Sequence, residues 1–203
     1  MGLASLTTCK VVPVVTAVDV ASTVQLAKAL QRGGIKVIEI TMRSDCALAS
    51  IQAVRTQVPG LLVAAGTVTN SEALTQVKKA GAELVFSPGC SDSLLRAATA
   101  AGVDFIPGVC SASEIMLCLD HGFECLKLFP AEAAGGRSLL KAFSGPFPQV
   151  RFCPTGGLDE ENFRAYLEMP NVVCCGGSWM VTSTLVSNGQ WDEIERLARE
   201  AMA

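Results

Sequence analysis

The sequence predicts an α/β fold, a single (β/α)8 TIM barrel that spans residues 1–203. The main observation is a repeated unit, in which a helical segment ends at a glycine and a short apolar segment follows. Gly81, Gly102 and Gly122 close three such helical segments at intervals of about 20 residues. The second observation is that eight apolar segments have the character of strands. Strands that alternate with helices form parallel sheets, and eight such units form a barrel.

The strands are predicted from runs of Val, Ile, Leu and Phe that are bounded by turn residues. In chain order they are Val11–Val15, Val37–Thr41, Val63–Val68, Leu84–Pro88, Phe105–Gly108, Leu126–Phe129, Val150–Pro154 and Val172–Cys175. Between them, Ser71 begins one helical segment, and Ser111 with Glu114 has the spacing of a capping box. The runner-up fold is an open doubly wound sheet, but no Gly-x-Gly-x-x-Gly follows the first strand.

Composition and charge exclude several classes of function. Half of the residues are hydrophobic, 17% are charged and the net charge is −3, so nothing favours a nucleic-acid or membrane partner. The N-terminus lacks a basic region followed by a long apolar segment, so we expect no signal peptide. Nine scattered cysteines without a Cys-x-x-Cys pair indicate reduced thiols and a cytoplasmic protein. With one histidine, His121, at a helix end, we expect no metal and no cofactor.

Lys127 stands out because it interrupts the apolar segment Cys125–Pro130, which is predicted to be a buried strand. Burying an ammonium group is costly, so such a lysine pairs with an acid or reacts as an amine. A neutral amine in a dry pocket forms a Schiff base with a carbonyl substrate. The alternative is a lysine at the end of a strand whose ammonium group reaches solvent.

Strand parity indicates which way this lysine points. Successive side chains of a strand face opposite sides, so Leu126 and Leu128 face the helices while Lys127 and Phe129 face the barrel interior. In the second strand the same rule turns Glu39 and Thr41 inward, together with Arg43 if the strand extends that far. Glu39 is therefore a plausible partner for Lys127, close to the strand ends where barrel active sites lie. A purely structural ion pair across the barrel is the other interpretation.

Glycine pairs end the last two predicted strands. Thr155-Gly156-Gly157 follows the seventh strand, and Gly176-Gly177-Ser178 follows the eighth. Barrel enzymes often bind phosphate at these two positions through exposed backbone N–H groups, and glycine allows close approach of the oxygens. A single Gly-Gly is usually a turn, but two at these positions favour an anion site. Gly66-Thr67 at the end of the third strand also fits a close approach of substrate.

Several motifs resemble those of the bacterial 2-keto-3-deoxy-6-phosphogluconate (KDPG) aldolases, which often also cleave 4-hydroxy-2-oxoglutarate (KHG). The resemblance covers nearly the whole chain. The motifs are Glu39–Arg43, Gly66–Val68, Ser87–Gly89, Lys127–Glu132, Arg151–Gly157 and Gly176–Trp179.

The resemblance implies roles for the matching positions. Lys127 is then the Schiff-base lysine and Glu39 the general acid/base of a class I aldolase that acts on KDPG and releases pyruvate. Arg43 and Thr67 hold the pyruvate carboxylate. Pocket and phosphate contacts are implied for Pro88, Phe129, Thr155, Gly156, Gly157, Gly176, Gly177 and Ser178. A metal-free homotrimer is also implied.

Three alternatives stay open at this point. A related group cleaves the galactonate epimer of the substrate and shares the lysine and the glutamate, but it differs at Thr41-Met42-Arg43. A phosphosugar epimerase or isomerase on the same barrel works without a covalent intermediate. A barrel that only binds phosphorylated metabolites is the third, because a fold alone does not determine chemistry.

Overall fold

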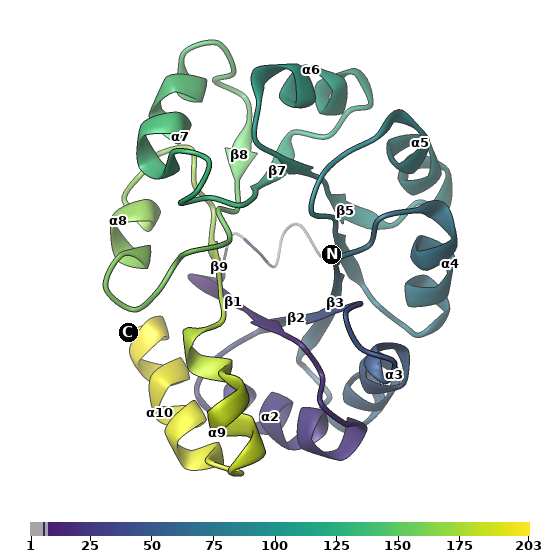
Figure 1. Cartoon of the computed structure of the whole chain (residues 1–203), viewed down its shortest axis with the longest axis vertical. Helices are drawn as coiled ribbons and strands as arrows, with labels where there is room; N and C mark the ends of the chain where they lie inside the picture. The colour runs from purple at the N-terminus through teal and green to yellow at the C-terminus, as the bar shows by residue number, and fades with distance from the viewer. Residues whose placement is uncertain (1–5, 7) are drawn as a thin grey trace.

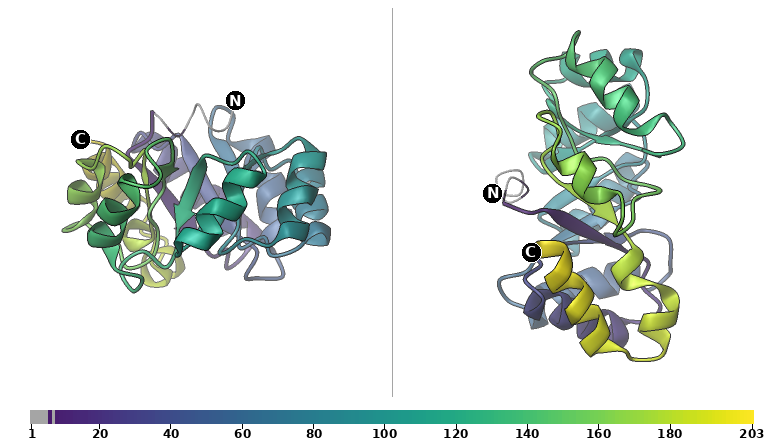
Figure 2. Two further views of the ribbon diagram at one scale, coloured as in Figure 1. Left: turned by 90° about the horizontal axis from the view of Figure 1, so that it is seen from above. Right: turned by 90° about the vertical axis from the view of Figure 1, so that its left-hand side faces the viewer.

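Parallel strands curl around the centre of the molecule and helices cover them on the outside (Figure 1). The computed structural model describes residues 6 and 8–203. The expectation that no signal peptide is present concerns residues 1–5, which lie outside the described residues. The molecule is shallow along the viewing direction of Figure 1, as Figure 2 shows.

Six strands form one parallel sheet in the order β5-β4-β3-β2-β1-β9, and three more form a second in the order β6-β7-β8. The strands are β1 (Val11–Val15), β2 (Val37–Thr41), β3 (Leu62–Gly66), β4 (Leu84–Phe86), β5 (Asp104–Ile106), β6 (Gly108–Val109), β7 (Cys125–Leu128), β8 (Arg151–Phe152) and β9 (Cys175–Gly177). The first strand pairs with the last, Val11 beside Cys175. The doubly wound alternative reverses its strand order in the middle of the sheet, which this sheet does not do.

The expectation of eight strands in one continuous barrel is met in part. β5 and β6 occupy the segment predicted as one strand, but Pro107 separates them and has no N–H for a ladder. β8 contains only Arg151–Phe152, and the predicted strand Val172–Cys175 is displaced to Cys175–Gly177. Two isolated parallel bridges, Phe152 with Val172 and Thr155 with Gly176, connect the two sheets on this side. The described residues therefore form a curled six-stranded parallel sheet with a three-stranded parallel sheet facing it.

Helices follow nearly every strand. They are α2 (Val20–Arg32), α3 (Ala47–Gln57), α4 (Ser71–Lys79), α5 (Asp92–Ala101), α6 (Ala112–Asp120), α7 (Gly136–Ser144), α8 (Phe163–Leu167), α9 (Ser183–Ser187) and α10 (Trp191–Met202), with the 3-10 turn η1 (Trp179–Val181). Within the described part of the chain, none of them is both long and apolar enough to span a bilayer.

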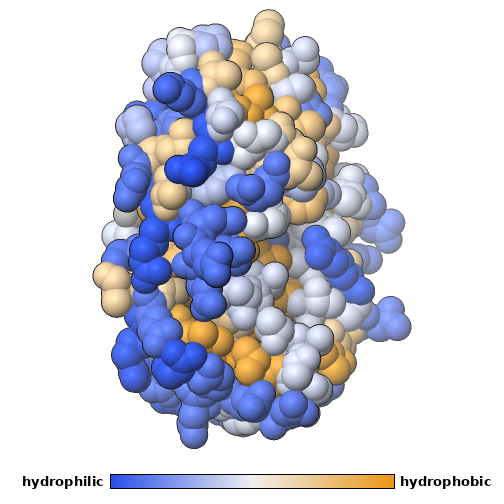
Figure 3. Space-filling model, turned by 60° about the vertical axis from the view of Figure 1, so that its left-hand side comes forward, coloured by the Kyte–Doolittle hydropathy of each residue, from blue (hydrophilic) through white to orange (hydrophobic). Residues whose placement is uncertain are grey.

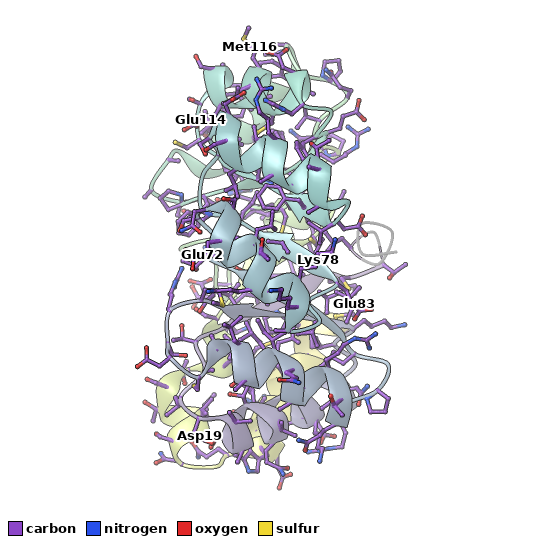
Figure 4. All side chains as sticks on the ribbon, turned by 90° about the vertical axis from the view of Figure 1, so that its right-hand side faces the viewer. Asp19, Glu72, Lys78, Glu83, Glu114 and Met116 are labelled. Carbon is purple, nitrogen blue, oxygen red and sulfur yellow. The ribbon has the colours of Figure 1, made fainter. Side chains whose placement is uncertain are left out.

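Side-chain caps explain where several helices begin. Asp19, Asn70, Ser91 and Ser111 each accept a hydrogen bond from a backbone N–H in the first turn of α2, α4, α5 and α6. Figure 4 shows the common direction of these helices, with Glu72 and Lys78 at opposite ends of α4. The helices therefore begin on the side where the strands end, which is the side of the candidate site.

Buried side chains form two separate hydrophobic clusters, as strand parity requires. Ile38, Ile40, Leu126 and Leu128 belong to the large cluster between strands and helices. The smaller cluster lies on the inner face of the strands, in the interior that they enclose. It contains Val12, Val37, Ala64, Leu84, Phe86, Ile106, Cys153 and Cys174. The interior is therefore closed by apolar packing at one end, and Glu39 and Lys127 lie above that layer.

The first and last long helices pack closely where α2 ends. A Cβ atom placed on Gly33 would lie 2.5 Å from the Cβ of Ala198 and 2.7 Å from the carbonyl oxygen of Glu195, both on α10. Arg32 and Glu195 form a partly exposed ion pair beside this contact. The missing side chain at Gly33 thus lets the C-terminal helix lie against the beginning of the fold.

We predict that Gly33→Ala lowers the free energy of unfolding by about 2 kcal/mol, because the added methyl group overpacks the contact between α2 and α10. Urea unfolding followed by circular dichroism measures this. Gly145→Ala is the matched control, since its new Cβ would meet nothing within 4 Å and its φ of −68° suits alanine. Equal stabilities of the two variants would contradict the prediction.

Candidate active site

A buried ion pair lies at the centre of the strand interior. The Lys127 Nζ atom on β7 is 3.0 Å from Oε1 and 3.2 Å from Oε2 of Glu39 on β2. Lys127 is 4% exposed and Glu39 is 2% exposed, so both charges are withdrawn from water. The inward orientation predicted from strand parity is confirmed. A carboxylate and an amine at this separation can exchange a proton directly.

The surrounding strands are shaped to admit this pair. A Cβ atom on Gly66 of β3 would lie 2.1 Å from the Glu39 Oε1 atom, so only glycine leaves room for the carboxylate. The ammonium group lies 5.3 Å from the centre of the Phe86 ring and 5.4 Å from that of Phe129. Aromatic faces attract a cation without accepting its proton. The lysine is thus held by one carboxylate and two rings and is almost fully buried.

Arg43 and Thr67 meet at the open end of the same interior. The Arg43 Nε atom donates a hydrogen bond to the Thr67 hydroxyl oxygen at 3.1 Å. Thr67 has a φ of 59°, which is unusual for a β-branched residue and is sustained only where surrounding structure enforces it. Arg43 is exposed, so its guanidinium is free to grip a carboxylate with two parallel hydrogen bonds.

A pocket of about 120 Å³ connects Lys127 and Arg43 with both glycine pairs. Its lining also includes Phe129, Thr155, Leu158, Val14 and Ser178. A second hollow of about 300 Å³ shares Val14, Arg43 and Ser178 with it and extends the opening toward α9. A larger groove of about 950 Å³ lies between α7 and α8, but it lacks the buried lysine–glutamate pair. The chemistry therefore belongs to the smaller pocket.

The two glycine pairs present backbone to the pocket. Gly156 and Gly157 both have positive φ, at 100° and 81°. In the part of the chain that the structure describes, their N–H groups donate to no protein acceptor. Glycine is also required at Gly176, where a Cβ would lie 2.3 Å from the Thr155 hydroxyl oxygen, and at Gly177, where it would overlap the Trp179 ring. Free amides without side chains suit a phosphate or carboxylate.

Most predicted site residues meet at this pocket, and Pro88 is the exception. Glu39 and Thr67 join it through their bonds to Lys127 and Arg43. Pro88 does not line the pocket; its backbone instead packs so closely on Gly108 that a Cβ there would lie 2.3 Å from the Pro88 carbonyl carbon. Gly108 pairs with Lys127 in the sheet, so Pro88 packs on the strand next to the lysine.

Sequence reasoning missed Val14 and Leu158 as pocket residues. Val14 lies opposite Glu39 in the sheet register and is the one half-buried residue of β1. The alternation of inward and outward side chains along β1 is the sequence signal that could have identified Val14 as a pocket residue. Leu158 follows the Gly156–Gly157 turn, and no sequence signal marks it. Sequence reasoning also missed the hydrogen bond that Tyr166 donates to Glu132. These residues are 34 positions apart, and no local sequence pattern indicates their contact.

Charge in the pocket suits a substrate with negative groups at both ends. Lys127 and Arg43 are cationic, Glu39 balances one of them, and free amides lie at the far end.

Among residues 6 and 8–203, no group of three or more His, Cys, Asp and Glu side chains could hold a metal ion. Burial raises the pKa of Cys9 to about 11 and that of Cys125 to about 12, which leaves both thiols protonated and unreactive at neutral pH.

Comparison with known proteins agrees with this geometry. The family model for KDPG and KHG aldolase matches residues 3–197. The chain belongs to the KDPG and KHG aldolase family. The KHG/KDPG aldolase of Escherichia coli K12 is 47% identical over 197 residues, which is 97% of this chain and 92% of that protein. The 2-dehydro-3-deoxy-phosphogluconate aldolase of Pseudomonas aeruginosa is 47% identical over 95% of this chain and 88% of that protein.

Solved structures of aldolases in this family have the same fold. KDPG aldolase from Legionella pneumophila, with pyruvate captured as a covalent carbinolamine, is 41% identical, with a TM-score of 0.94 over 97% of this chain and 95% of that one. The Zymomonas mobilis ZM4 enzyme with 3-phosphoglycerate is 41% identical, with a TM-score of 0.93 over 99% and 95%. A native KDPGal structure, 23% identical with a TM-score of 0.79, shares the fold alone.

We predict that Lys127→Met lowers the free energy of unfolding by about 3 kcal/mol, because it leaves the Glu39 carboxylate buried without a partner. The double variant Lys127→Met/Glu39→Gln should lose less, since no unpaired charge remains. Urea unfolding of the wild type, both single variants and the double variant completes a double-mutant cycle, which measures the coupling free energy of the two side chains. Equal losses in Lys127→Met and the double variant would mean that the two groups are not coupled.

Proposed function

We propose that the protein is a class I aldolase that cleaves 2-dehydro-3-deoxy-6-phosphogluconate to pyruvate and glyceraldehyde 3-phosphate. The observation that carries this proposal is the buried Lys127–Glu39 pair at one end of a pocket whose other end is free glycine backbone. An amine sheltered from water suits imine formation with a ketone. The names of the related aldolases support the same reaction.

The substrate is bound at its two charged ends. Arg43 and Thr67 take the carboxylate beside the ketone, which places that ketone over Lys127. Gly156, Gly157, Gly176, Gly177 and Ser178 surround the phosphate. Phe129 and Thr155 line the space between the two ends, and Pro88 packs on Gly108 in the strand next to Lys127. Fixing both ends holds the reacting carbons in one orientation, which lowers the entropic cost of the reaction.

The first chemical step uses the contact between Lys127 and Glu39. Glu39 accepts a proton from the ammonium group, and the neutral amine adds to the C2 carbonyl. The protonated acid then supplies a proton as the carbinolamine loses water and becomes an iminium ion. One carboxylate can serve several proton transfers because it alternates between acid and base. The positive iminium nitrogen is the electron sink for the next step.

Cleavage then follows at the neighbouring bond. Glu39, directly or through a water molecule, removes the proton of the C4 hydroxyl, and the C3–C4 bond breaks. Its electrons form the enamine, and glyceraldehyde 3-phosphate leaves with a new C4 carbonyl. The enamine takes a proton at C3, and water adds to the resulting iminium to release pyruvate and restore Lys127. Carbon, protons and electrons balance without an external oxidant or a cofactor.

We further propose that 4-hydroxy-2-oxoglutarate is a second substrate, cleaved to pyruvate and glyoxylate. Its far carboxylate would occupy the amide end of the pocket in place of a phosphate. The bifunctional name of the Escherichia coli relative supports this.

We also propose that residues 1–203 form one domain whose two sheets are a single eight-stranded barrel. The bridges Phe152–Val172 and Thr155–Gly176 support continuity between the sheets. The proposal of a homotrimer is based on the family resemblance. Figure 3 shows hydrophobic side chains among the hydrophilic ones on one side of the molecule.

The proposal of a cytoplasmic location is based on nine free cysteines, which suit a reducing compartment.

The alternative functions explain fewer features of the site. Cleavage of the galactonate epimer uses the same lysine and glutamate and is decided by the contacts to the C4 hydroxyl, so it remains the second candidate. An epimerase or isomerase that forms no covalent intermediate has no use for a sheltered amine beside the substrate. A protein that only binds metabolites would gain nothing from burying two charges, since a buried pair is a weak source of stability.

The experiment that tests the proposed function is borohydride reduction in the presence of pyruvate, followed by peptide mass analysis. We expect one reduced pyruvate adduct, on Lys127, because its amine is the one sheltered at the pocket. Lys141, an exposed lysine on α7, is an internal control that should stay unmodified. An adduct on another residue, or none at all, would rule out this mechanism.

We predict that Glu39→Gln forms the pyruvate adduct more slowly than the wild type and turns over KDPG at least about a hundredfold more slowly, because a neutral amide cannot accept a proton from the ammonium group or from the C4 hydroxyl. Steady-state release of pyruvate, coupled to lactate dehydrogenase, gives the turnover number. Glu114→Gln, in the first turn of α6 and outside the pocket, is the matched control. If Glu39→Gln keeps wild-type turnover, another group must be the acid/base.

A further inference from the structure

We infer that Tyr166, Glu132 and Asn162 are positioning residues that hold the Gly156–Gly157 turn in the shape that binds the distal anion of the substrate. This inference rests on the proposed function, since it concerns the end of the same pocket opposite Lys127. None of the three residues lines that pocket. They line the neighbouring groove between α7 and α8, on the other side of the turn.

The first support of the turn is Glu132. Its backbone N–H donates to the carbonyl oxygen of Gly156 at 3.1 Å, just as the N–H of Ala131 donates to that of Thr155 at 2.8 Å. The Glu132 side chain also packs directly against the turn. A Cβ atom on Gly157 would lie only 2.7 Å from the Glu132 Cβ. A shift of Glu132 would therefore shift both glycines.

Tyr166 on α8 determines where the Glu132 carboxylate lies. The phenol is fully buried and donates a hydrogen bond to Glu132 Oε1. Gly136 allows this contact, because a Cβ there would lie 2.7 Å from the phenol oxygen. Burial, followed by the hydrogen bond to Glu132, raises the pKa of Tyr166, so the phenol stays a donor throughout the neutral range. The bond keeps a negative carboxylate in the α7–α8 groove and away from the anion end of the pocket.

Asn162 supports the turn from the other side. Its Nδ2 donates to the carbonyl oxygen of Gly157 at 3.1 Å, while its Oδ1 accepts from the N–H of Asp159 at 3.0 Å. The Gly156 and Gly157 carbonyls are thus both bound from behind, by Glu132 and Asn162. A peptide group whose carbonyl is fixed on one side presents the adjoining N–H groups in a fixed direction. That is the preorganisation an anion site needs, because the turn is not reorganised when the ligand binds.

The test compares a reaction that needs the anion end with one that does not. Cleavage of KDPG needs it, whereas exchange of the pyruvate methyl protons with deuterium, followed by NMR, needs Lys127 and Glu39 but no phosphate. We expect Tyr166→Phe to raise the KM for KDPG about fivefold, the effect of one lost hydrogen bond. The rate of pyruvate exchange and the KM for pyruvate should not change. Inorganic phosphate, used as a competitor, should inhibit this variant correspondingly less.

Conservative and matched variants separate positioning from general damage. Glu132→Gln keeps an oxygen that can accept from the phenol and should retain the wild-type KM, while Glu132→Ala should behave like Tyr166→Phe. Asn162→Ala should raise the same KM without affecting pyruvate exchange. Thr23→Val, which removes a buried hydroxyl on α2 that donates to the carbonyl of Asp19, controls for a loss of stability alone.

The outcomes are distinguishable. If wild-type protein exchanges no pyruvate protons, the proposed function fails, and this inference fails with it. If the wild type exchanges them and Tyr166→Phe leaves the KM for KDPG unchanged, only the inference is wrong. A variant that impairs KDPG cleavage and pyruvate exchange equally would show a general structural role and would also overturn it.

Discussion

The ion pair between Lys127 and Glu39 is the interaction on which the other features of the site depend. Two charges can be buried here only because each satisfies the other at 3.0 Å and apolar packing closes the interior behind them. Several sequence features serve this pair. Gly66 leaves space for the carboxylate, and Phe86 and Phe129 face the ammonium group. The same arrangement that makes the pair tolerable also keeps a reactive amine away from water.

Backbone, more than side chains, builds the opposite end of the pocket. Gly156 and Gly157 leave free N–H groups, and Gly176 and Gly177 allow close contacts where other residues would place a Cβ atom. The groups that act on the substrate are therefore divided by chemistry. In the proposed mechanism, charged side chains from β2 and β7 act on the ketone and its protons, and the ends of the last two strands bind the distal anion. Under this proposal, the reacting centre stays the same while the distal group changes from phosphate to carboxylate.

Strand parity explains why much of the site was predictable. A lysine and a glutamate that each alternate with large aliphatic residues must face the same interior, so Lys127 and Glu39 were paired correctly without coordinates. The glycine pairs were predictable because they follow the last two predicted strands, although Gly176 and Gly177 lie within β9 in the structure. Parity says nothing about where a ladder stops, so the break at Pro107 and the displacement of the last strand to Cys175–Gly177 were missed. It also cannot say which residue of one unit meets a helix of another, as Tyr166 meets Glu132.

The most direct test of the central claim is a crystal structure of the protein frozen after soaking with pyruvate. We predict continuous density from the Lys127 Nζ atom to C2 of pyruvate, with the pyruvate carboxylate on Arg43 and Thr67 and with Glu39 beside the new bond. Pyruvate bound elsewhere, or bound in this pocket without a bond to Lys127 although the crystals remain active, would contradict the account.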